Sequence, residues 1–214
     1  IEDLFDRIEA AGVLQRIDRS VRPSMFHGAT VSQAELEVLR QIKNIVRLGR
    51  VQRIEREQIV LQQGSIPTST SVVHVDCSAS AIPNLVMKPI FEPGLITPQT
   101  VRSYQPVFSA ALIAHVEATR ETDDEKNKIC NVVPLPNHDT DWIRMMIAYM
   151  TNQYQWSRDP DLRQWLLAAR LDGFSAMARE AAAADPAKAE VMKRIRDAVF
   201  PAMTKLQKFA AEIG

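Results

Sequence analysis

Prolines in the middle of the chain restrict what this sequence can fold into more than any other feature. The stretch from residue 83 to residue 98 holds four of the twelve: Pro83, Pro89, Pro93 and Pro98. Proline removes a backbone donor and clashes with the preceding helical turn, so no long helix can cross this stretch. We interpret it as a connector between a first half with short strand-like runs and a second half with helical periodicity.

The first half is predicted to contain two short helices and then a sheet. The opening IEDLFDRIEAAG has apolar residues at helical spacing and Gly12 at the position of a left-handed C-cap. A second helix follows Ser32, which forms a capping box with Glu35. The apolar runs then become short, which predicts strands of an antiparallel meander and one further strand, buried on both faces. These strands are Ile45–Leu48, Val51–Glu55, Gln58–Leu61 and Val72–Cys77.

The second half is predicted to be helical. Pro106 suits a first helical position, and Asp139 is expected to cap a helix that runs to Trp156. Asp159 and Pro160 open a helix that reaches Leu171, and residues 186–213 form a long amphipathic helix that is kinked at Pro201. The expected fold class is α+β, with a small mixed sheet and flanking helices in residues 1–104 and a helical region in 105–214 packed on it.

Composition excludes several function classes. Lysine plus arginine equals aspartate plus glutamate, 26 each, so the chain has no net positive charge that would attract nucleic acid. No window holds the roughly 18 uninterrupted apolar residues of a membrane helix, and no basic-then-apolar leader opens the chain. We therefore expect a cytoplasmic protein. The two cysteines, Cys77 and Cys130, are not in a CxxC arrangement, which argues against a disulfide scaffold or a structural zinc.

The segment VRLGRVQRIEREQIVLQQGSIPTSTSVVHVDCSAS resembles part of the two-dinucleotide-fold flavoprotein oxidoreductases, relatives of glutathione reductase and the flavin monooxygenases. In that family a meander leads into a strand that ends in Ala-Thr-Gly. Residues 51–64 correspond to the meander and residues 72–79 to the strand, and the likeness spans residues 45–117. It implies the C-terminal half of a bacterial enzyme that passes hydride from NAD(P)H to FAD and then to an acceptor that the sequence does not identify.

Two departures from the family define what this chain can bind by itself. Cys77, Ser78 and Ala79 stand where Ala-Thr-Gly is usual, and the seven glycines form no GxGxxG motif. The backbone donors that cradle a pyrophosphate are therefore missing. We expect the isolated chain to bind neither FAD nor NAD(P), and the enzyme to require a cofactor-binding half. The first residue, Ile1, indicates processing or a start within a longer gene product.

The resemblance also implies which residues face the cofactor. In the family, the helix after the last strand of the flavin domain points its positive N-terminus at the flavin ring, where it favours the reduced flavin. The equivalent helix here begins near Pro106. The residues expected on the flavin side are Arg102, Tyr104, Gln105 and Ser78. The sequence indicates no catalytic residue.

Three side chains that can bind metals or catalyse reactions, His74, Asp76 and Cys77, lie within four positions of each other. Alternation along the predicted strand puts His74 and Asp76 on one face and Cys77 on the other, so the three cannot bind one ion. We interpret them as scaffold and expect no metal site. His115, in the middle of a predicted helix, is interpreted as a core or interface residue.

A second reading of the chain is a cofactor-free helical module for protein interaction or oligomerisation. Trp142, Met145, Tyr149 and Trp156 share a helical stripe, which is typical of a core or an oligomer contact. If a cofactor-binding half packs here, residues 72–77 and 106–117 should leave apolar surface exposed in the isolated chain. We therefore expect a homo-oligomer, with these elements as the first candidate contact and the tryptophan stripe as the second.

Overall fold

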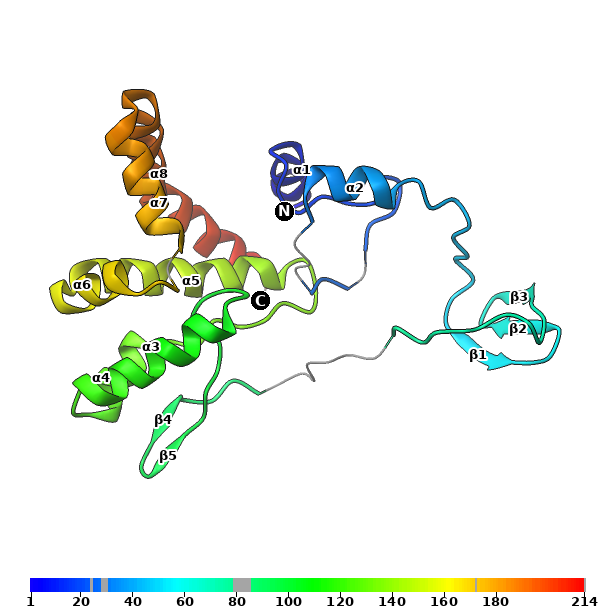
Figure 1. Ribbon diagram of the computed structural model, residues 1–214, viewed down its shortest axis with the longest axis horizontal. Coiled ribbons are helices and arrows are strands. Elements are labelled where there is room, and N and C mark those ends of the chain that lie inside the picture. Colours follow the sequence, from blue (N-terminus) through cyan, green and yellow to red (C-terminus); the bar gives the residue numbers. More distant parts are fainter. Residues whose placement is uncertain (24, 28–30, 79–85, 172, 214) are drawn as a thin grey trace. The chain divides into compact units, whose positions relative to one another are not determined.

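The chain forms two compact units. The computed structural model describes residues 1–23, 25–27, 31–78, 86–171 and 173–213, and the side chains of residues 173–175 are not described. The larger unit comprises residues 1–16, 20–30 and 87–214, and the smaller unit comprises residues 17–19 and 31–86. The predicted boundary after residue 104 falls inside the larger unit. Figure 1 shows the elements of both units.

The fold class is α+β, as the sequence predicts. The described residues form eight helices and five short strands, and the helices dominate the second half of the chain. In chain order the elements are α1 (Glu2–Ala10), α2 (Gln33–Leu39), β1 (Val51–Ile54), β2 (Gln58–Leu61), β3 (Gly64–Pro67), β4 (Phe91–Glu92), β5 (Leu95–Ile96), α3 (Pro106–Thr119), α4 (Asp123–Ile129), α5 (Asp141–Arg158), α6 (Pro160–Ala168), α7 (Gly173–Ala184) and α8 (Pro186–Ile213).

The smaller unit holds α2 and a three-stranded antiparallel meander, β1-β2-β3. Helix α2 begins with the predicted capping box between Ser32 and Glu35. A two-residue loop joins β2 to β3, and the register pairs Leu61 with Gly64. The sheet buries little of its apolar surface, because every residue of β1 is exposed and Leu61 is the one buried residue in β1, β2 and β3.

Two predicted strands of this unit are wrong. Residues 45–48 and residues 72–77 have no strand conformation. Val73 and Val75 are 85% and 77% exposed, so the segment expected to lie in the middle of a sheet lies on the surface. β-Branched residues favour a strand only when a neighbouring strand pairs with them. No described strand pairs with this segment.

The described part of the proline-rich connector, residues 86–98, contains a hairpin that its sequence does not predict. Strands β4 and β5 form a small hairpin around Pro93 and Gly94, and Gly94 adopts a left-handed backbone with φ 74°. Asn127 of α4 holds the hairpin at its base. Its Oδ1 accepts the N–H groups of Ile90 and Phe91, each at 3.0 Å, and its Nδ2 donates to the Phe91 carbonyl at 2.7 Å.

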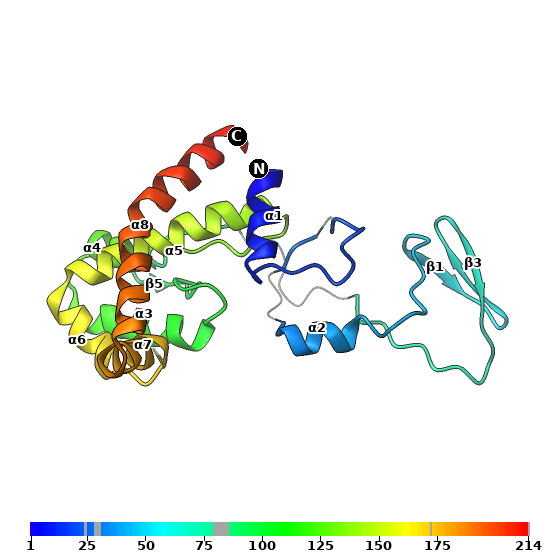
Figure 2. The same ribbon diagram turned by 90° about the horizontal axis from the view of Figure 1, so that it is seen from above.

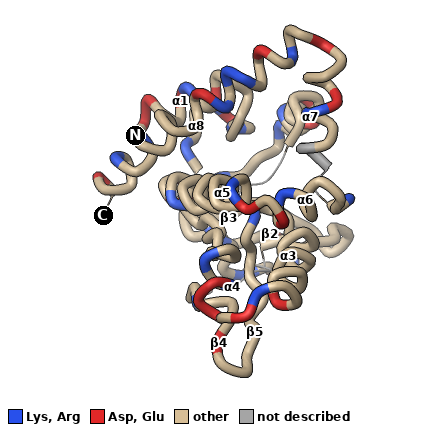
Figure 3. Tube along the Cα trace, turned by 90° about the vertical axis from the view of Figure 1, so that its left-hand side faces the viewer, with Lys and Arg blue, Asp and Glu red and all other residues tan. Residues whose placement is uncertain are grey.

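Helix α5 is the centre of the larger unit and contacts α4, α6 and α8. Figures 1 and 3 show α3 and α4 on one side of α5 and the α7–α8 pair on the other. The core lies between α3, α5 and α6, where the rings of Phe108 and Trp156 are 5.7 Å apart. Two residues of the tryptophan stripe, Met145 and Trp156, are buried, and Trp156 belongs to this core. At these positions the stripe is a packing face.

Helix α1 and the loop after it pack on the start of α5 (Figure 2). The rings of Phe5 and Trp142 meet edge to face, with centroids 6.2 Å apart. Arg22 forms an ion pair with Asp139 at 3.2 Å. Asp139 therefore anchors the N-terminal segment, and its predicted role as a helix cap is wrong: the N-cap of α5 is Thr140.

We predict that Asn127→Ala destabilises the larger unit by about 1–3 kcal/mol, because it leaves two buried backbone N–H groups without an acceptor. Urea unfolding followed by circular dichroism measures this change. The control is Asn131→Ala, two residues beyond α4, because the Asn131 side chain is exposed. An equal effect of the two substitutions would contradict the clamping role of Asn127.

Candidate functional site

The resemblance places a site at the turn before α3, and the structure gives this turn a specific conformation. The N–H of Gln105 donates to the carbonyl of Arg102 at 3.3 Å, and Tyr104 has a left-handed backbone with φ 56°. Ser109 Oγ ties the turn to the helix, since it donates to the Gln105 carbonyl and accepts the Val101 N–H. The turn thus sits directly at the N-terminus of α3.

The three predicted residues of this turn have different environments. Arg102 is only 6% exposed, and its guanidinium carbon lies 4.4 Å from the centre of the Phe108 ring, inside the unit. Gln105 is half-buried and is the N-cap of α3, without a side-chain capping bond. Tyr104 is 40% exposed, and its partial burial raises the pKa of its hydroxyl. Tyr104 is therefore the member of the three that presents a ring to the surface.

Ser78, the fourth predicted residue, belongs to the smaller unit. Its N–H and Oγ both donate to Asp76 Oδ1, at 2.8 and 2.6 Å, and these bonds lower the pKa of the Asp76 carboxyl. His74 bonds to Thr68 at 3.0 Å, and Cys77 is an exposed free thiol. Each side chain thus has its own surroundings, and the described residues contain no group of three or more metal ligands.

A buried polar cluster beneath the turn was missed by the sequence analysis. Asn152 of α5 is fully buried, and its Nδ2 donates to the carbonyls of Val101 and Asn131, at 2.9 and 2.7 Å. Its Oδ1 has no hydrogen-bond partner among the described residues, and the same holds for two other buried atoms, Ser103 Oγ in the turn and Gln153 Nε2 in α5. An asparagine within the apolar pattern of α5 is the one signal in the sequence. These atoms can accept or donate to a bound water or ligand.

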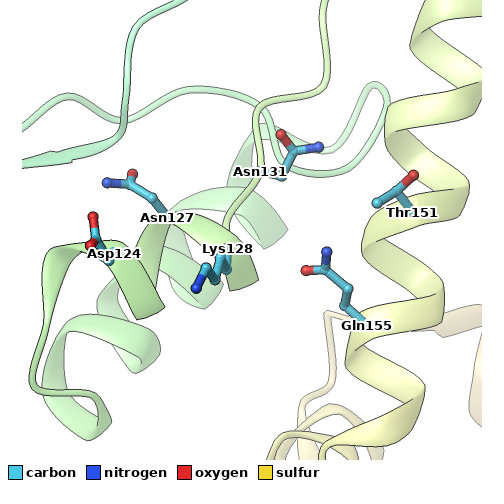
Figure 4. A pocket seen from close by; sticks show the side chains of 6 residues that line it. All are labelled: Asp124, Asn127, Lys128, Asn131, Thr151 and Gln155. Carbon is cyan, nitrogen blue, oxygen red and sulfur yellow. The ribbon is translucent and has the colours of Figure 1, made fainter.

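A polar depression between α4 and α5, of about 560 Å³, is the second candidate site (Figure 4). Its lining residues are Asp124, Asn127, Lys128, Asn131, Thr151 and Gln155. Ligand pockets are mostly apolar with a few polar groups, whereas every residue here is polar. Asn127 is already committed to the β4–β5 hairpin, and Thr151 Oγ1 donates to the Ile147 carbonyl. We interpret the depression as solvated surface.

His115 has a packing role, in line with the sequence prediction. Its ring stacks on Trp165 at 4.5 Å with an angle of 12° between the planes. Burial, and then the charge of Arg120, lower the pKa of His115 more than Asp159 raises it. Arg120 and Asp159 form an ion pair at 2.5 Å, and Asp159 also caps α6 through the Leu162 N–H at 2.9 Å.

The relatives found by comparison with known proteins are longer than this chain. Proteins named as uncharacterised in two strains of Mycobacterium tuberculosis and in Mycobacterium bovis are 52% identical to this chain over 171 residues. The match covers 80% of this chain but 32% of each relative, so the chain spans about a third of their length. No family model and no solved structure matches.

The helices of the described ranges include none that is both long and apolar enough to cross a bilayer.

The two cysteines should differ sharply in reactivity. Burial raises the pKa of Cys130 to about 12, so this thiol carries almost no thiolate at neutral pH, whereas Cys77 is exposed. We predict that Ellman's reagent modifies one thiol in the native chain and two after denaturation. Cys77→Ser should abolish the native reaction, and Cys130→Ser should leave it unchanged. Rapid native labelling of the Cys77→Ser variant would contradict the burial of Cys130.

His115 should make the larger unit less stable in acid. Its pKa in the folded state lies below the ordinary value of 6.5, so the unfolded chain takes up the proton first. This contribution to stability is complete above pH 6.5 and is lost as the pH falls below that value. Thermal unfolding between pH 8 and pH 5 measures it. His115→Gln should flatten the dependence in this range, and His138→Gln, at an exposed position, should not.

Proposed function

We propose that this chain is the C-terminal portion of a flavin-dependent NAD(P)H oxidoreductase, and that it supplies the helix beside the flavin and part of the cover over the substrate. The observation that carries the proposal is the exposed face of α3, the helix that the resemblance assigns to the flavin side. Val107 is 66% exposed, and Ala110, Ala114 and Ala118 are exposed on the same side.

Helix α3 is apolar on both sides. Phe108, Leu112 and Val116 are buried in the core, and the small apolar residues lie on the outer face. A helix that is apolar all round is normally enclosed by protein. Small side chains also let a second surface approach the helix closely. The outer face therefore fits a contact with a further domain better than a contact with water.

The relatives are long enough to contain such a further domain. About two thirds of each relative lies outside the match. Such a length can hold the phosphate-cradling motifs that this chain lacks. The exposed Val73 and Val75 add apolar surface of the kind expected if a cofactor-binding half normally covers this part of the sequence.

In this proposal the turn before α3 lies beside the ring end of the flavin. The N-cap Gln105 leaves the first-turn N–H groups of Val107 and Phe108 without a side-chain cap, and the Tyr104 ring is exposed beside them. The positive end of the α3 dipole would favour a reduced, electron-rich ring. Arg102 would position the turn through Phe108 rather than contact the cofactor.

When bound, FAD would accept hydride from NAD(P)H and pass the electrons to an acceptor. This chain would exclude water and orient the ring through Tyr104 and the start of α3. Because the enzyme draws on NAD(P)H, we place it in the cytoplasm. The exposed α3 face remains our candidate contact for a homo-oligomer of the isolated chain.

The proposal predicts that this chain alone is colourless and shows no saturable binding of FAD at micromolar concentration, whereas the full-length protein that contains it purifies yellow and oxidises NADH or NADPH. Ala114→Arg in the full-length protein should reduce its flavin content, since the arginine would separate α3 from the cofactor-binding half. Flavin absorbance measures both results.

The matched control is Ala183→Arg, at an exposed position of α7. It introduces the same side chain away from α3 and should leave the flavin content unchanged. A full-length protein without flavin or NAD(P)H oxidation would refute the oxidoreductase and favour the interaction module.

A further inference from the structure

Helix α8 carries a stripe of exposed aliphatic side chains. Val191, Ile195 and Val199 follow one another at four-residue spacing and so share one side of the helix. They are 50%, 55% and 41% exposed. Figure 1 shows α7 along the first half of α8. Leu206, further along α8, is buried. The apolar side of α8 is therefore covered near Leu206 and exposed at the stripe.

Two arginines border this stripe. Successive residues of a helix are 100° apart, so Arg194 and Arg196 lie on the two sides of Ile195. Within the described part of the chain neither arginine forms an ion pair, and Lys188 forms none either. Figure 3 shows several basic positions along α8 in blue. This surface therefore combines an exposed apolar stripe with positive charges that have no ion-pair partner in the described part of the chain.

We propose that this face of α8 docks an acidic amphipathic helix of a partner protein. The aliphatic side of that helix would cover Val191, Ile195 and Val199, and its flanking carboxylates would pair with Arg194 and Arg196. This is the helix-on-surface mode of peptide recognition, in which apolar anchors supply affinity and flanking charges supply specificity. The proposal does not depend on the flavin chemistry.

The charge pattern argues against a second copy of the chain as the occupant. In a two-fold pair the stripe would face itself, and Arg194 and Arg196 of both copies would border one contact. Like charges at the edges of a helix pair disfavour pairing. The acids of this part of α8, Glu190 and Asp197, lie away from the stripe by the same 100° geometry.

A lipid surface fits less well than a helix. Helices that lie on membranes place aromatic residues on the same apolar side as the aliphatic ones. Phe200 is the exposed aromatic residue described on α8, at 79%, and it lies about 140° round the helix from Ile195. One flat surface cannot cover both Phe200 and the stripe.

The test uses two synthetic helical peptides of about twenty residues, each with leucine on one side, one flanked by glutamates and one by lysines. Binding to the chain is followed by fluorescence anisotropy. We expect saturable, salt-sensitive binding of the glutamate peptide alone. Ile195→Glu should weaken it at least about tenfold, and Arg194→Glu combined with Arg196→Glu should transfer binding to the lysine peptide.

The control is Lys193→Glu, a single charge reversal on the opposite side of α8, which should leave the preference for the glutamate peptide unchanged. Circular dichroism of each variant separates loss of binding from loss of folding. Equal binding of both peptides by the wild-type chain would overturn the proposal. Ile195-dependent binding to phosphatidylglycerol vesicles without peptide binding, or an Ile195-dependent dimer, would assign the face to a membrane or to a second copy instead.

Discussion

The larger unit depends on buried side chains of α5 that donate hydrogen bonds to backbone carbonyls of irregular segments. Asn152 Nδ2 bonds the carbonyls of Val101 and Asn131, and Trp156 Nε1 bonds the carbonyl of Ile129 at 2.8 Å. A buried carbonyl without a partner is costly, so these bonds fix where the chain can run. They attach the segments before α3 and after α4 to one helix.

The candidate site follows from this attachment. Because Asn152 holds Val101, the next residues must turn before α3 begins, and the turn brings Tyr104 to the surface while Arg102 points into the aromatic core. The site is therefore a consequence of α5, which lies about fifty residues later in the chain. Asn152 Oδ1 and Ser103 Oγ form no hydrogen bond with the described residues, so this region has buried polar atoms that a bound water or ligand can contact.

The two exposed apolar surfaces of the larger unit differ in chemistry, and the difference separates their proposed partners. The face of α3 has small side chains without basic borders, which suits close, permanent packing against another domain. The stripe on α8 has larger aliphatic side chains between arginines, which suits a charged helix. Permanent contacts favour apolar area, and specific contacts add complementary charge.

The sequence by itself determined the elements whose signals are local. The capping box of α2, the Asp159 cap of α6, the extent of α8 and the strand Gln58–Leu61 depend on neighbours within a few residues, so spacing alone predicts them. Three features required the tertiary structure: the exposed course of residues 72–77, the β4–β5 hairpin held by Asn127, and the anchoring role of Asp139. Asn127 and Asp139 bind residues that are distant in sequence, and no described strand pairs with residues 72–77. The start of α3 at Pro106 was predicted from the local sequence, but the inward direction of Arg102 and the buried Asn152 were not, because both depend on packing against residues distant in sequence.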